Sequence, residues 1–74
     1  MINNIQVLYS RINDKKKFIE LVANDFNKSF TGLHTNWFSS WKIPQENQER
    51  LHTLLINFLK QEIKLNEKLI RDEN

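Results

Sequence analysis

The chain has 74 residues, with one glycine, one proline and no cysteine, and its 11 basic and 9 acidic side chains give a formal net charge of +2. This length suffices for one domain but not for two, and the lack of cysteine excludes a disulfide framework, a CxxC redox pair and a cysteine-based zinc site. Residues 1–20 contain no apolar stretch typical of a signal peptide, and no apolar run approaches the roughly 20 residues that cross a bilayer. We therefore expect a cytoplasmic protein that does not engage membranes. The small net charge permits binding to a polyanion without requiring it.

Helical spacing of apolar residues runs through almost the whole chain. It predicts an all-α fold, a small helical domain over residues 1–74 with a central helix-turn-helix and a long C-terminal helix. The expected helices cover about residues 4–12, 15–26, 31–41 and 45–70.

The first helix is predicted from one apolar stripe, with Asn3 or Asn4 as its N-cap; the stripe consists of Ile5, Leu8, Tyr9 and Ile12. Asp14 is a good N-cap for a second helix. The two helices could instead be fused, because apolar residues recur every seven positions at Ile5, Ile12, Ile19 and Phe26. Lys15 and Lys16 occupy the seam between those positions, which favours a break.

The central part of the chain contains two signals for helix ends. Asn27-Lys28-Ser29 interrupts the apolar periodicity, and Asn27 suits a left-handed position at a helix end. Thr31 is the expected N-cap of the next helix, whose buried stripe is predicted to contain Leu33, Trp37 and Trp41. Ile43-Pro44 ends that helix, and Pro44 opens the last one.

The last helix carries two apolar stripes and is too long for the rest of the chain to cover. The half beyond about Lys60 is expected to expose a set of apolar side chains, Ile63, Leu65, Leu69 and Ile70. This exposed set predicts a homodimer interface. Fraying of the last turns in a monomer is the alternative.

The solvent face of the 31–41 helix is predicted to be polar but uncharged, unlike most solvated helix faces, which are rich in Glu and Lys. Such side chains suit the edges of DNA bases, which Asn, Thr and Ser can recognise by hydrogen bonds. The predicted base-reading residues are Thr31, His34, Thr35, Asn36 and Ser39. Basic residues nearby are predicted phosphate contacts: Lys15, Lys16, Lys17, Lys28, Lys42 and Arg50.

The stretch Phe18 to Ala23, then Phe26, the turn, and Trp37 through Ile43-Pro44 resembles the small repressor-like helix-turn-helix regulators of phages and prophages. The resemblance covers about residues 18–45. It implies that Ala23 is the alanine packed inside the first motif helix and that Thr31, His34, Thr35 and Asn36 face DNA. Two features depart from the family pattern: Asn27-Lys28 stands where the family has glycine and an apolar residue, and the spacing from Ala23 to Trp37 is one residue longer.

These observations lead to the expectation of a sequence-specific DNA-binding protein, a small transcriptional regulator of phage or prophage type that binds double-stranded DNA as a homodimer. The alternative is a small phage-encoded inhibitor that binds a host protein complex through the same scaffold. We expect no enzymatic activity and no cofactor. His34 and His52 lack carboxylates or histidines at ligand spacing, so no metal site is expected either.

Overall fold

The computed structural model describes the backbone of residues 1–72 and the side chains of residues 1–65. Within this part of the chain, α-helices joined by short loops are the only regular secondary structure. The chain order is α1 (Ile2–Ser10), α2 (Lys15–Phe26), α3 (Phe30–Asn36) and α4 (Gln45–Asp72). The predicted all-α fold with a long C-terminal helix is therefore confirmed.

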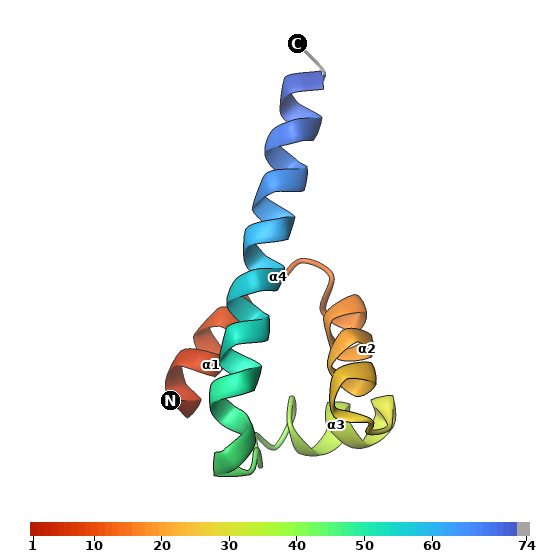
Figure 1. The fold of residues 1–74 in the computed structure, drawn as a ribbon, viewed down its shortest axis with the longest axis vertical. Helices are drawn as coiled ribbons and strands as arrows, with labels where there is room; N and C mark the ends of the chain where they lie inside the picture. Colours follow the sequence, from red (N-terminus) through yellow and green to blue (C-terminus); the bar gives the residue numbers. More distant parts are fainter. Residues whose placement is uncertain (73–74) are drawn as a thin grey trace.

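Helix α4 is the axis of the molecule (Figure 1). Helices α1 and α2 flank its N-terminal half, and α3 lies at the foot of α2. The C-terminal half of α4 rises clear of the other helices, which gives the chain an elongated shape of 45 × 23 × 18 Å.

Helices α1 and α2 are separate, as the sequence favoured. Asp14 caps α2, because its carboxylate accepts a hydrogen bond from the Lys17 amide at 3.1 Å. The proposed cap of α1 was wrong: the helix begins earlier, with Met1 at the N-cap and no side-chain cap. This earlier start places Ile2 on the helix, where it packs against the core.

The turn between α2 and α3 is tight. Asn27 adopts a left-handed conformation with φ 54°, as predicted, and the Lys28 amide donates to the Ala23 carbonyl at 2.9 Å. Ser29 rather than Thr31 is the N-cap of α3, since its hydroxyl accepts from the Gly32 amide at 3.1 Å. A Cβ at Gly32 would lie 2.8 Å from that hydroxyl oxygen, so glycine allows the cap to close.

Helix α3 ends at Asn36 instead of continuing to residue 41. The amides of Trp37 and Phe38 both donate to the Leu33 carbonyl, and Trp41 has a positive φ of 59°. A straight helix would leave Phe38 beside the buried stripe. The irregular segment instead buries Trp37 and Phe38 together and directs the chain back toward α4.

The core joins all four helices and is rich in aromatic rings. Tyr9 stacks on Phe38 with ring centroids 4.7 Å apart, and Phe18 meets Phe58 edge-on at 5.3 Å. Trp41, half-buried, packs edge-on against Tyr9. The buried side chains are Ile5, Ile12, Phe18, Ile19, Val22, Leu33, Trp37, Phe38, Ile43, Leu51, Leu55 and Phe58.

Helix α4 follows directly after Pro44, as predicted. Its buried stripe reaches Phe58 and then meets Glu62, which interrupts the apolar pattern for a structural reason. The Glu62 carboxylate accepts hydrogen bonds from the backbone amides of Asn13 at 3.2 Å and Asp14 at 3.0 Å. Glu62 thus connects α4 to the loop between the end of α1 and the start of α2.

Candidate nucleic-acid interface

Helix α3 presents a polar face to solvent. Leu33 is buried beneath it, whereas Thr31, His34, Thr35 and Asn36 are exposed. None of these four side chains carries a carboxylate or an ammonium group, so the exposed surface of the helix is polar without fixed charge.

Ser39 is exposed too, but it lies beyond the end of α3. Its hydroxyl donates a hydrogen bond to the His34 carbonyl at 2.8 Å. Since that carbonyl belongs to the last turn of the helix, Ser39 satisfies one of the terminal acceptors. A contact from Ser39 to a base would have to compete with this bond.

The basic residues near α3 fall into two groups. Lys15 and Arg50 are engaged within the fold. The Lys15 ammonium donates to the Ile12 carbonyl at 2.8 Å and lies 5.6 Å from the centre of the Tyr9 ring. Arg50 forms a two-pronged ion pair with Asp25, with N–O distances of 2.8 and 2.9 Å. Both residues hold helices together, a role that their spacing in the sequence did not indicate.

The other group is exposed: Lys16 and Lys17 at the start of α2, Lys28 before α3, and Lys42 after it. Lys28 also lies 5.9 Å from the Trp37 ring centre, which steadies its stem without removing its charge from solvent. Lysines therefore stand on both sides of α3 along the chain.

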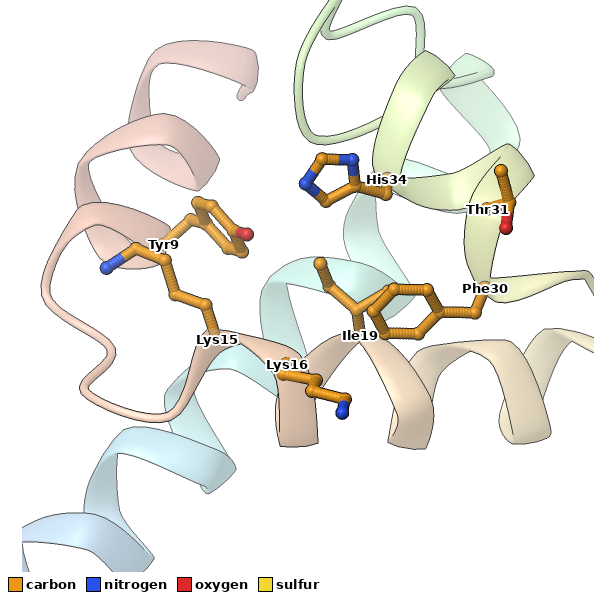
Figure 2. Close-up of a pocket in the computed structure, with 7 residues that line it drawn as sticks. All are labelled: Tyr9, Lys15, Lys16, Ile19, Phe30, Thr31 and His34. Atoms are coloured by element: carbon orange, nitrogen blue, oxygen red, sulfur yellow. The ribbon is translucent and has the colours of Figure 1, made fainter.

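A pocket of about 410 Å³ brings residues of the two predicted sets together. It lies between the C-terminal end of α1, the N-terminal half of α2 and α3, and is lined by Tyr9, Lys15, Lys16, Ile19, Phe30, Thr31 and His34. Figure 2 shows the rings of Tyr9 and His34 pointing toward one another across this pocket. Two predicted base-reading residues thus share one surface with a free basic side chain, Lys16.

Charge is unevenly distributed along the chain. Residues 1–45 contain six basic and three acidic side chains, a net charge of +3, whereas residues 46–74 contain five basic and six acidic ones, a net charge of −1. The excess positive charge belongs to the part of the chain that forms α1, α2 and α3. The overall charge of +2 hides this difference.

A second surface lies where α2 meets the middle of α4. Leu65 is 59% exposed there, and Leu21 on α2 is 39% exposed. Ile63, predicted to share this interface, is 55% exposed but lies two residues from Leu65 and therefore faces another side of α4. A groove of about 310 Å³ is lined there by Lys17, Leu21, Phe58, Gln61, Glu62 and Leu65. The side chains of Leu69 and Ile70, assigned to the same interface from the sequence, lie outside the described residues.

Sequence reasoning missed several of these residues. Leu21 fits the broad apolar face of its helix, so its partial exposure had no signal in the pattern. Tyr9 and Phe30 could be recognised as apolar positions. Their meeting in one pocket depends on how α1 packs relative to α2 and α3, which the sequence pattern does not indicate.

Within residues 1–65 no group of three or more acidic, histidine or cysteine side chains is arranged to hold a metal ion. No helix in the part of the chain that the structure describes is both long and apolar enough to span a membrane. Comparison of the chain with protein-family models, curated protein sequences and solved structures finds no match.

Proposed function

We propose that this chain is a sequence-specific DNA-binding protein that uses α3 as its reading helix, a small transcriptional regulator of phage or prophage type. The observation that carries the proposal is the common surface of Thr31, His34 and Lys16. DNA recognition needs polar groups that reach base edges and cations that hold the adjacent phosphates, and this surface supplies both.

The side-chain environments divide the roles. Thr31, His34, Thr35 and Asn36 read bases, because they are exposed and free of fixed charge. The phosphate contacts come from the exposed lysines, Lys16, Lys17, Lys28 and Lys42. In this proposal Lys15, Arg50 and Ser39 stabilise the fold and add little to the interface with DNA.

The length of α3 argues for two copies on one site. Its seven residues extend over roughly 10 Å, which corresponds to only about three base pairs of DNA. A helix this short distinguishes few DNA sequences. Two copies related by two-fold symmetry on a near-palindrome double the number of base pairs that are read. The apolar side chains of Leu21 and Leu65, which line one groove, are the proposed contact between the two copies.

Selection from random duplex DNA at moderate salt tests the function directly. A near-palindromic sequence should be enriched, and the affinity for it should fall steeply as salt is raised, because each neutralised phosphate releases counterions. A folded protein that enriches no sequence and binds DNA only weakly at low salt would overturn the proposal.

Matched variants test the residue roles. Thr35→Ala combined with Asn36→Ala should lower affinity for the selected site at least about tenfold and leave nonspecific binding unchanged. Lys16→Ala should weaken binding to all sequences and reduce the salt slope by about 0.9, whereas Lys60→Ala on α4 should leave the slope unchanged. Retained specificity in the Thr35–Asn36 double variant would overturn the base-reading role of these two residues.

The groove beside Leu21 and Leu65 supports a second candidate, a small phage-encoded inhibitor that binds a host protein complex. An exposed apolar surface on a small protein suits a protein partner. In that case Leu65→Glu would abolish binding to the target, and the affinity would depend weakly on salt.

A further inference from the structure

The pocket between α1, α2 and α3 has the form of a small-molecule site. Its volume of about 410 Å³ lies within the usual range for ligand pockets, about 300–1,000 Å³. Its walls are mainly aromatic and aliphatic: the Tyr9 ring on one side, the Phe30 and His34 rings on the other, and Ile19 between them (Figure 2).

The aromatic walls favour a flat ligand. The rings of Phe30 and His34 are nearly parallel, with an angle of 9° between their planes and 6.3 Å between their centroids. The Tyr9 ring stacks on Phe38 with ring centroids 4.7 Å apart, so its position does not depend on a ligand. A planar ring can therefore contact preformed apolar surfaces from several sides.

The polar groups of the pocket favour a negative charge. Two lysines, Lys15 and Lys16, line it, and none of the acidic side chains of residues 1–65 does. Lys15 is held by the Ile12 carbonyl, which leaves Lys16 free to pair with an anion at the rim. The hydroxyl groups of Tyr9 and Thr31 and the imidazole of His34 add hydrogen-bonding groups around the same space.

We propose that this pocket binds a small planar aromatic anion, a ring that carries a carboxylate or a phosphate group. The ring lies between Tyr9 and the Phe30–His34 pair, and the anionic group faces Lys16. This inference does not depend on DNA binding. It has one consequence that rests on the proposed function: Thr31 and His34 serve both sites, so the ligand and DNA exclude each other, and the ligand acts as an effector.

Indole-3-carboxylate is a suitable probe, since it is planar, anionic and has about twelve non-hydrogen atoms. Titration into ¹⁵N-labelled protein should give saturable amide shifts centred on Ile19, Thr31 and His34. The expected Kd is on the order of 1 mM or tighter for a ligand of this size. Absence of saturable shifts, or shifts that do not cluster at this pocket, would overturn the proposal.

Matched ligands and variants test the recognition. The neutral indole-3-carboxamide and the non-planar cyclohexanecarboxylate should each bind about two- to fivefold more weakly than indole-3-carboxylate. Lys16→Met and His34→Ala should weaken binding of the probe by about two- to fivefold, whereas Lys60→Met and Asn36→Ala should not change it. Equal binding of the carboxamide, or no effect of either pocket variant, would refute an anion site.

The effector role is tested by adding the probe to the complex with the selected DNA. Displacement of DNA from the parent protein by the probe, at a concentration at which the weaker ligand indole-3-carboxamide displaces little, supports shared use of the surface, and simultaneous binding of probe and DNA would overturn it. A protein that binds the probe but no DNA sequence would refute the proposed function while leaving the pocket assignment intact.

Discussion

Glu62 provides the sharpest test of how the fold is held together. Its carboxylate accepts two backbone hydrogen bonds, from the amides of Asn13 and Asp14, which lie 49 and 48 residues earlier in the chain. Because these bonds join α4 to the loop before α2, they fix the position of α2 and α3 relative to α4. The substitution Glu62→Ala removes both acceptors and keeps a good helix former at this position.

The loss of stability expected for Glu62→Ala depends on how exposed the two amides are. Hydrogen bonds to charged groups contribute about 1.5–3 kcal/mol each, but both amides here lie in an exposed loop and can bind water after the substitution. We therefore expect a total loss of about 1–2 kcal/mol in the free energy of unfolding. A domain of this size has a stability of roughly 4–11 kcal/mol. With an unfolding entropy of about 0.16 kcal/mol/K for 74 residues, the loss corresponds to a decrease of about 6–13 °C in Tm.

Thermal unfolding followed by circular dichroism measures this loss, with Lys60→Ala as the control on an exposed position of the same helix. Amide hydrogen exchange adds a local measurement, since the Asn13 and Asp14 amides should lose protection in Glu62→Ala and keep it in the control. A Tm equal to that of the control, or unchanged exchange at the two amides, would refute the role assigned to Glu62.

Three further predictions concern the turn, the core and the proposed interface. Asn27→Ala should lower the free energy of unfolding by about 1 kcal/mol in urea titrations while Asn27→Gly should not, because alanine disfavours the left-handed conformation at φ 54°. Burial raises the pKa of Tyr9 above its ordinary value of 10.0. The folded state therefore retains the proton longer than the unfolded state, stability should decrease as pH rises above 10, and absorbance at 295 nm should show this tyrosine titrating later in native protein than in urea. Leu65→Glu should give a monomer in sedimentation equilibrium with unchanged helicity, while Lys60→Glu should remain dimeric; a monomeric parent protein would contradict the proposed interface.

Local signals made much of the fold predictable. Asp14, Asn27 and Pro44 act on the backbone within a few residues of their own positions, through a side-chain cap, a left-handed turn and a fixed φ. Helix ends set by such residues can be recognised in the sequence. The apolar stripe of α4 is similarly local, because its period depends only on the geometry of the helix.

The end of α3 was not predictable in the same way. The spacing of Leu33, Trp37 and Trp41 fits a continuous helix, and no residue between them is a strong breaker. After α3 the chain takes a wider turn, in which the amides of Phe38 and Ser40 donate to carbonyls five residues earlier. This path places the Phe38 ring against Tyr9 and Phe18. Tyr9 and Phe18 come from other helices, so the deciding contacts are tertiary and leave no periodic signal.

The same distinction applies to the basic residues of the candidate site. The position of a lysine or arginine in the sequence does not show whether its side chain contacts phosphate or an oxygen of its own chain. Lys15 and Arg50 were therefore predicted to be phosphate contacts. Their partners, the Ile12 carbonyl and the Asp25 carboxylate, become visible only in the fold. Four exposed lysines remain as candidates.

Arg50 shows why affinity alone cannot assign a phosphate contact. The Arg50 side chain is 62% exposed, yet its guanidinium is paired at both prongs with Asp25 and lies 5.3 Å from the centre of the Phe26 ring. Arg50→Ala removes a link between α4 and α2. Under the proposed function it would weaken DNA binding by shifting the α2–α3 pair. The salt slope separates the two roles: loss of a phosphate contact lowers the slope by about 0.9, whereas loss of a positioning contact lowers affinity at every salt concentration and leaves the slope unchanged. We expect the second result for Arg50→Ala and the first for Lys16→Ala; a reduced slope in Arg50→Ala would place Arg50 on the DNA after all.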